Sequence, residues 1–173
     1  SGYIAAAAAA LGGIDILINN ASGFGMSDDE AGWAVGMQVD VMAVVRASHA
    51  ALPHLKASQG HLVAGSSLAG LVGVPGRTAY SASQFAMAGF FEALRTELRG
   101  AGVSVTTAYP GVVLTNFASH GDAEMQGYLK NAPGLTPAQV AETVVWMAKA
   151  AATGMPGGRH FYDMAEQPIG PNA

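Results

Sequence analysis

Short apolar runs alternate along the chain with longer stretches in which apolar residues recur every three or four positions. The runs at 14–19, 61–66 and 103–109 are typical of β-strands, and the segment 159–163 predicts a final edge strand. Residues 14–19 (IDILIN) are apolar almost throughout, which is expected of a strand that is buried on both faces of a parallel sheet.

The periodic stretches predict helices over residues 28–55, 79–100 and 136–152. Ser27 is expected to be the N-cap of the first of these helices, because Glu30 follows three residues later and completes a capping box. Six alanines follow one another at 5–10, and they indicate equally the end of a helix or a run in which alanine stands in for unassigned side chains.

The helix at 79–100 carries an apolar stripe that favours a place in the core or in a subunit interface over a ligand site. The stripe consists of Met87, Phe90, Phe91, Leu94 and Leu98. Glycines at 100 and 102 are expected to end this helix, and Thr136 with Pro137 is expected to begin the last one. Strands alternate with helices and no repeat or linker interrupts them, so the chain is predicted to be α/β with a parallel sheet, in one domain over residues 1–173.

Composition narrows the class of function. The chain has 173 residues, of which 50% are hydrophobic and 12% charged, which suits one soluble domain with a sizeable core. A net charge of -4 offers no basic surface for nucleic acid or anionic membrane, and the absence of cysteine excludes disulfides and sulfur-based metal sites. The apolar run near the N-terminus is too short to span a bilayer and follows no positive charge, so we expect a cytoplasmic protein.

The candidate chemistry lies between the second predicted strand and the helix that follows it. Ser66 and Ser67 end the strand, while Tyr80 and Gln84 lie four residues apart and share one face of the helix. Strand ends and helix starts meet at the carboxyl edge of a parallel sheet, where ligands bind in open α/β folds. Arg77, in the loop between them, is either a solvated charge or a group that orients an acidic substrate.

This arrangement resembles the short-chain dehydrogenase/reductase family, classical type, over nearly the whole chain. The family places a serine thirteen residues before its tyrosine, which selects Ser67 and Tyr80. The segment LGGIDILINNAS at 11–22 is similar to the family's fourth strand and exit turn, with Ser22 where the family usually has glycine. The segment PGVVLT at 110–115 is similar to a second family loop.

The resemblance implies the C-terminal two thirds of a Rossmann-like, doubly wound fold that transfers a hydride between NAD or NADP and a carbonyl or secondary alcohol. Tyr80 would then be the acid/base and Ser67 would bind the substrate oxygen. Gln84 stands where the family has lysine, and Asp40 where it has the asparagine of a proton relay. The positions that match the family's cofactor contacts are Asn20, Ala21, Ser22, Tyr80, Gln84, Pro110, Gly111, Val113 and Thr115. Ser22 is expected to crowd the cofactor.

The resemblance also implies a small-molecule carbonyl or alcohol substrate, no nucleic acid or membrane partner, and a homo-oligomer, either dimer or tetramer. Residues 116–135 are polar and broken by glycine and proline, which favours a mobile segment; in the family this region covers the substrate. Its apolar members suggest a partly apolar substrate; they are Phe117, Met125, Tyr128 and Leu129.

Two features set this chain apart from the family pattern. The Gly-rich cofactor turn and the residue that selects NAD or NADP would lie upstream of residue 1, so we expect that residues precede Ser1. Gln84 has no charge, although free tyrosine titrates near about 10 and needs a nearby cation to act as a base at neutral pH. Two hypotheses follow: an NAD(P)-dependent oxidoreductase, or a non-catalytic binding or assembly protein of the same fold.

Other chemistries fit the sequence less well. The second glycine of GSSLAG at 65–70 comes too late for the nucleophile elbow of α/β-hydrolases. His49 and His54 are five residues apart and diverge on a helix, and no pair among the five histidines has metal-ligand spacing.

Overall fold

The fold is a parallel sheet with helices on both faces, seen in a computed structural model that describes residues 2–121, 123–152 and 159–161. Within these residues four strands pair in the order β1-β2-β3-β4. They are β1 (Ile16–Asn19), β2 (His61–Gly65), β3 (Ser104–Tyr109) and β4 (Arg159–Phe161), and all three pairings are parallel. The predicted α/β class and Rossmann-like architecture are confirmed.

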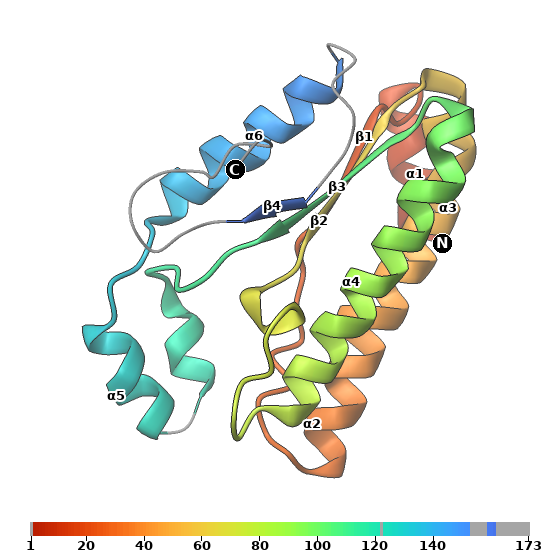
Figure 1. The fold of residues 1–173 in the computed structure, drawn as a ribbon. Coiled ribbons are helices and arrows are strands. Elements are labelled where there is room, and N and C mark those ends of the chain that lie inside the picture. The colour runs from red at the N-terminus through yellow and green to blue at the C-terminus, as the bar shows by residue number, and fades with distance from the viewer. Residues whose placement is uncertain (1, 122, 153–158, 162–173) are drawn as a thin grey trace.

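Helices connect the strands and cover the sheet (Figure 1). The α-helices are α1 (Gly2–Leu11), α2 (Glu30–Val35), α3 (Val44–Ser58), α4 (Thr78–Leu98), α5 (Ala123–Asn131) and α6 (Pro137–Ala152). Shorter or wider helical segments are η1 (Gly36–Ala43, a π-helix), and the 3-10 segments η2 (Leu68–Gly70), η3 (Arg99–Ala101) and η4 (Asn116–His120). Figure 1 shows α1, α3 and α4 on one side of the sheet and α6 on the other.

The larger core cluster lies between the sheet and the helices α1, α3 and α4. Leu55, Leu62 and Phe91 have no exposed surface at all within it. Four members of the predicted stripe on α4 are buried here, and Phe90 packs against them, so the prediction of a core stripe is confirmed. A smaller cluster on the other face joins Val63 to Met147 of α6. The two clusters together hold the strand ends that carry the candidate site.

The strand β1 differs from the prediction that it is buried on both faces. Ile16 and Ile18 are 43% and 44% exposed. In the described part of the chain β1 lies at the edge of the sheet, and α1 and α3 pack on one side of it. The apolar run correctly indicated a strand, but it did not indicate which elements cover it.

The predicted cap of the first long helix was wrong. Asp29, not Ser27, is the N-cap, and its carboxylate Oδ1 accepts a 2.8 Å hydrogen bond from the backbone N–H of Gly32. Ser27 instead donates its hydroxyl to the same Asp29 oxygen, at 2.8 Å. The helix begins at Glu30 because the carboxylate of Asp29 reaches the free N–H groups of the first turn.

The remaining boundaries largely follow the sequence pattern. The helix predicted over 28–55 runs continuously from Glu30 to Ser58, through the π-helix η1. Gly102, with φ of +72°, ends the turn η3 that follows α4, and α6 begins at Pro137 as predicted. Residues 116–135 contain η4 and α5, which the glycines and proline in this segment did not predict. β4 confirms the last strand over 159–161, and residues 162–163 lie outside the described part of the chain.

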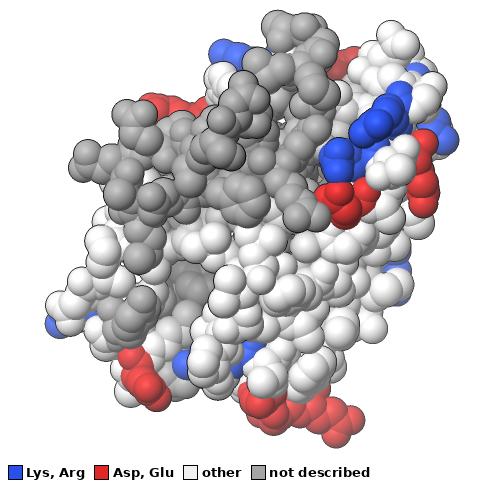
Figure 2. Space-filling view, in the orientation of Figure 1, with Lys and Arg blue, Asp and Glu red and all other residues white. Residues whose placement is uncertain are grey.

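Charge is sparse on the visible surface. In Figure 2, charged side chains stand in small groups near the edges, and uncharged side chains fill the area between them outside the grey residues. Among the described helices, none is both long enough and apolar enough to cross a membrane.

Candidate active site

A cavity of about 790 Å³ opens at the carboxyl ends of β1, β2 and β3. Its walls come from the turn after β1, the η2 turn after β2, the start of α4 and the loop after β3. Every site residue predicted from the sequence lines it: Asn20, Ala21, Ser22, Asp40, Ser67, Tyr80, Gln84, Pro110, Gly111, Val113 and Thr115. The structure therefore brings these residues together, and their individual roles stay predictions.

Ser67 and Tyr80 meet in this cavity across a hydrogen bond between their side chains. Ser67 lies two residues beyond the end of β2 and caps η2, because its Oγ accepts the backbone N–H of Ala69 at 3.2 Å. The N–H of Leu68 donates to the carbonyl of Pro110 at 3.1 Å, which ties η2 to the end of β3. Tyr80 lies in the first turn of α4. Three elements thus position the two hydroxyl groups: η2, the end of β3 and the first turn of α4.

The surroundings of Tyr80 favour its protonated form. Burial raises the pKa of the Tyr80 phenol, the hydrogen bond from Ser67 lowers it in part, and the negative charge of Asp40 raises it further. Arg77 is the one cationic side chain among the described residues that line the cavity, and its Nη1 donates to the carbonyl of Gly76 at 2.9 Å.

Gln84 is built into the protein interior as well as into the cavity wall. It is 4% exposed, its Oε1 accepts a hydrogen bond from Ser66 Oγ at 3.2 Å, and its Nε2 donates to Asp40 Oδ2 at 3.4 Å. An amide nitrogen has a second hydrogen, and this hydrogen is what Gln84 can offer to a ligand. Gln84 therefore links the end of β2 to the helix segment η1.

Asp40 is a buried carboxylate that is held by hydrogen bonds. It is 1% exposed and lies in the π-helix η1. Its Oδ1 accepts the backbone N–H of Gly23 at 2.7 Å, and its Oδ2 accepts Ser83 Oγ at 3.2 Å in addition to Gln84. Donors of this kind stabilise a charged carboxylate away from water. Asp40 consequently fixes the loop after β1 to α4.

Ser22 replaces the glycine of the family turn, and its side chain is used locally. Its Oγ accepts the backbone N–H of Phe24 at 3.2 Å, while the residue also lines the cavity. The hydroxyl thus shapes the loop that follows β1.

Sequence reasoning missed several residues of the site. Ser66 was set aside in favour of its neighbour, although it contacts Gln84, and Ser83 was not considered, although it contacts Asp40. Ser83 directly precedes Gln84, where the chain departs from the family, and this neighbouring position was the signal that could have found it. Phe24 also lines the cavity, and its place directly after the turn of β1 could have indicated this.

Comparison with known proteins agrees with this geometry. A family model described as short chain dehydrogenase matches residues 1–126. The mouse protein "Dehydrogenase/reductase SDR family member 7B" is 39% identical over 158 residues, which are 83% of this chain and 49% of that protein. Bovine retinol dehydrogenase 8 is 38% identical over 112 residues, which are 61% of this chain and 36% of that protein. The chain spans about half the length of the first of these relatives.

The fold has a counterpart among solved structures. The crystal structure of an alcohol dehydrogenase from the archaeon Thermococcus sibiricus, complexed with 5-hydroxy-NADP, superimposes with a TM-score of 0.81. The match covers 96% of this chain and 69% of that one at 20% identity, so it shows a shared fold. With a family model that matches most of its length and relatives that agree with it, this chain belongs to the short chain dehydrogenase family.

Proposed function

We propose that the protein is an NAD(P)-dependent oxidoreductase that transfers a hydride between a nicotinamide cofactor and a carbonyl or secondary alcohol. The observation that carries the proposal is the hydrogen-bonded pair of Ser67 and Tyr80 in a cavity at the carboxyl edge of a parallel sheet. The names of the relatives, which include dehydrogenases and reductases, support the same class of reaction.

The residues around the pair fit a nicotinamide cofactor. The turn after β1 and the loop after β3 flank the cavity with small side chains and backbone groups, which allow a flat ring and its ribose to approach closely. The residues that would hold the cofactor are Asn20, Ala21, Ser22, Tyr80, Gln84, Pro110, Gly111, Val113 and Thr115. A bound nicotinamide supplies or accepts the hydride, and the choice between NAD and NADP is left to the assay.

In the reductive direction, Tyr80 donates its phenolic proton to the oxygen of the carbonyl as that oxygen gains negative charge. The hydroxyl of Ser67 holds the same oxygen in place by a hydrogen bond. Because burial and the charge of Asp40 raise the pKa of Tyr80, the proton is present at neutral pH and is available for this step. The reverse reaction requires the phenolate, which the same surroundings disfavour.

Turnover by the intact protein tests the proposal. NADH and NADPH are supplied with a panel of aldehydes and ketones, and Tyr80→Phe is compared with the matched variant Tyr3→Phe, whose side chain is 84% exposed on α1. Loss of a proton donor is expected to lower kcat by about 10²–10⁴-fold, while Tyr3→Phe leaves it unchanged. Absence of turnover, or equal rates for the two variants, overturns the proposal.

The alternative is a non-catalytic protein of the same fold that keeps the cofactor as a structural ligand. The observation that favours it is the raised pKa of Tyr80 beside a buried Asp40 carboxylate, in place of a cation. Binding of NADH or NADPH, measured by calorimetry, without turnover of any carbonyl would select this alternative.

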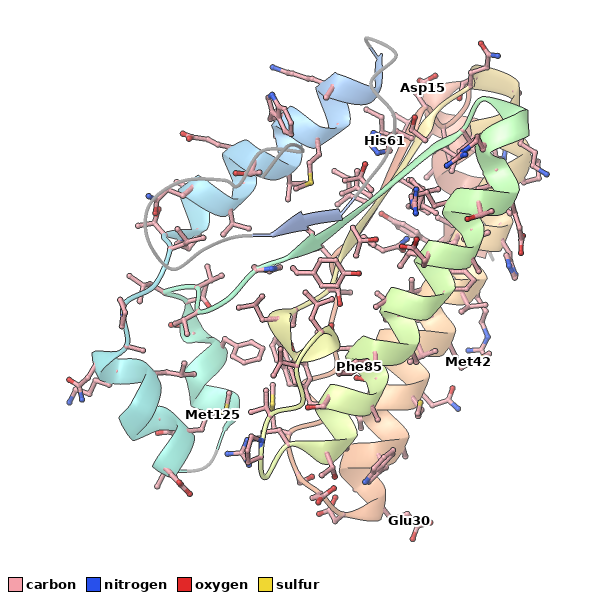
Figure 3. The ribbon with its side chains drawn as sticks, viewed as in Figure 1. Asp15, Glu30, Met42, His61, Phe85 and Met125 are labelled. Atoms are coloured by element: carbon pink, nitrogen blue, oxygen red, sulfur yellow. The ribbon has the colours of Figure 1, made fainter. Side chains whose placement is uncertain are left out.

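We also propose that the protein forms a homo-oligomer and works in the cytoplasm. Support for the oligomer comes from large apolar side chains that are exposed on adjoining helical segments, among them Met37, Met42 and Phe85 (Figure 3 labels the last two). Light scattering of the intact protein measures the oligomeric state, and a monomer at micromolar concentration contradicts it.

A further inference from the structure

Phe24 has an unusual backbone conformation in the loop that follows β1. Its φ is +51°, in the left-handed region that side chains other than glycine rarely adopt. Hydrogen bonds on either side hold the loop: Gly23 N–H donates to Asp40 Oδ1 at 2.7 Å, and Phe24 N–H donates to Ser22 Oγ at 3.2 Å. Conformations of this kind persist where the surroundings impose them, and they concentrate at functional sites.

The glycines that flank Phe24 press the loop against the helix beside it. A Cβ atom at Gly23 would lie 2.6 Å from Val35 Cγ1, and one at Gly25 would lie 2.4 Å from the carbonyl oxygen of Gly32. The backbone on both sides of Phe24 is thus packed against α2, while Phe24 itself lines the cavity. The loop presents an aromatic ring to the cavity on a rigid support.

A second ring that lines the cavity packs against Phe24. Phe117, in η4, packs edge to face against Phe24, with ring centroids 5.2 Å apart and an angle of 65° between the planes. The N–H of Phe117 donates to Thr115 Oγ1 at 3.1 Å, which fixes the start of η4. The Phe117 ring also lies 6.2 Å from the ring of Tyr80. Phe117 thus lies beside the proposed proton donor, and Phe24 packs against Phe117.

Three methionines add apolar, polarisable side chains to the wall. Met26, Met87 and Met125 line the cavity, and Met125 comes from α5, where Figure 3 labels it. Methionine sulfur and aromatic edges both interact favourably with a flat aromatic ring. Arg77 donates to the carbonyl of Gly76 in its own loop. Among the described lining residues, the carboxylates of Asp40 and Glu124 oppose an anionic substrate.

We propose that Phe24 and Phe117 form a specificity subsite that receives the aryl ring of an aryl ketone or aryl aldehyde. This inference rests on the proposed oxidoreductase function. In the step concerned, the carbonyl carbon gains a hydride from NADH or NADPH and its oxygen gains the proton of Tyr80. The products are an aryl carbinol and the oxidised cofactor, and the phenol is restored by a proton from solvent.

Matched substrates test the subsite. Acetophenone and cyclohexyl methyl ketone are methyl ketones of similar size, but only acetophenone has an aromatic ring, and conjugation with that ring makes its carbonyl less reactive toward hydride. The quantity to compare is therefore the ratio of kcat/KM for acetophenone to kcat/KM for cyclohexyl methyl ketone. This ratio is expected to be about 3- to 10-fold higher in the intact protein than in Phe117→Leu, the range of one favourable aromatic pair. 4-Acetylbenzoate adds a carboxylate to the aryl ring of acetophenone, and a preference for it over acetophenone would overturn the inference in favour of recognition by Arg77.

Variants assign the preference to the two rings. Phe24→Leu and Phe117→Leu are each expected to lower the ratio of kcat/KM for acetophenone to kcat/KM for cyclohexyl methyl ketone by about 3- to 10-fold, because a loss common to both ketones cancels in this ratio. Phe85→Leu is the matched control, because Phe85 lies on α4, is 47% exposed and does not line the cavity. Equal ratios of the two substrates in all four proteins would contradict the subsite.

A binding measurement separates this inference from the proposed function. Saturation-transfer NMR compares acetophenone with cyclohexyl methyl ketone on the intact protein and on Phe117→Leu. Selective binding of acetophenone that is lost in the variant supports the subsite even if nothing is turned over, a result that would overturn only the oxidoreductase. Turnover without selective binding would overturn only the subsite.

Discussion

Gln84 Nε2 donates a hydrogen bond to Asp40 Oδ2 at 3.4 Å, and both side chains are almost completely buried. These are the two positions at which the chain departs from the family pattern of lysine and asparagine, and the structure shows that they contact each other. An amide beside a carboxylate leaves a net negative charge next to Tyr80. The two departures are therefore best understood together.

Gln84→Lys is expected to lower the pKa of Tyr80 by about one unit, because an ammonium would face the phenol, and one unit corresponds to about tenfold in phenolate population. The new lysine would also pair with Asp40, which offsets part of its charge. The double variant Asp40→Asn with Gln84→Lys is therefore expected to show the larger shift. Ultraviolet titration of tyrosinate measures both, with Asp40→Asn alone as the control. An unchanged titration in the double variant would sink this account.

The pH dependence of the two directions is expected to differ. A raised pKa keeps Tyr80 protonated to higher pH, so kcat/KM for reduction should stay level from about pH 6 to about pH 9 and fall above the raised pKa. Oxidation of the corresponding alcohol needs the phenolate. Its kcat/KM should therefore rise with pH as the pH approaches the raised pKa of Tyr80. Initial rates in both directions give the profiles, and a decline of the reduction rate between pH 7 and pH 9, in a protein that stays folded, speaks against it.

The loss of stability on replacing Asp40 is expected to depend on how many hydrogen bonds the new side chain can still accept. Asp40→Leu leaves three donors without their acceptor, namely Gly23 N–H, Ser83 Oγ and Gln84 Nε2, and each orphaned donor costs about 1–3 kcal/mol. Asp40→Asn retains one oxygen, and the amide of Gln84 can rotate, so it should cost about 1 kcal/mol or less. Urea unfolding measures the free energies, and equal losses would contradict the hydrogen-bond network.

The adjacent serines at the end of β2 are expected to respond differently. Ser67→Ala removes the group that contacts Tyr80 and should lower kcat/KM by about 10- to 100-fold, with about 0.5–1 kcal/mol lost from stability because the same hydroxyl caps η2. Ser66→Ala removes the donor to Gln84 Oε1 and should cost about 1 kcal/mol of stability with a smaller effect on rate. Kinetics and urea unfolding of both variants test this assignment of roles. A larger loss of kcat/KM in Ser66→Ala than in Ser67→Ala would exclude it.

The sequence was sufficient to predict the strands, the long helices and many of the residues that line the cavity. Strand ends and a helix start carry Ser67, Tyr80 and Pro110, and parallel pairing brings such ends together whatever the details of packing. The stripe on α4 was predictable for a similar reason, since a period of 3.6 residues places its members on one face.

Features that depend on which side chains meet across the fold were not predictable. The contact of Asp40 with Gln84 joins residues 44 positions apart, and the Phe24–Phe117 pair joins two loops that have no shared periodicity. The cap at Asp29 was missed because Ser27 and Asp29 are both good capping residues, and the choice between them depends on where the helix packs. The exposure of β1 depends on its neighbours rather than on its own composition.

The π-helix η1 joins α2 and α3 into one long helix, and its wider turns change the rotation of α2 about the helix axis relative to α3. A π-turn takes up more residues than an α-turn, so the face that α2 turns toward the loop after β1 and the face that α3 turns toward the sheet need not lie in line. Asp40 lies within this widened stretch. A single-residue deletion between Gly36 and Asp40 would restore α-helical winding and rotate every side chain before it by about 100° relative to α3. In this protein the length of that segment, and not only its composition, is part of what builds the site.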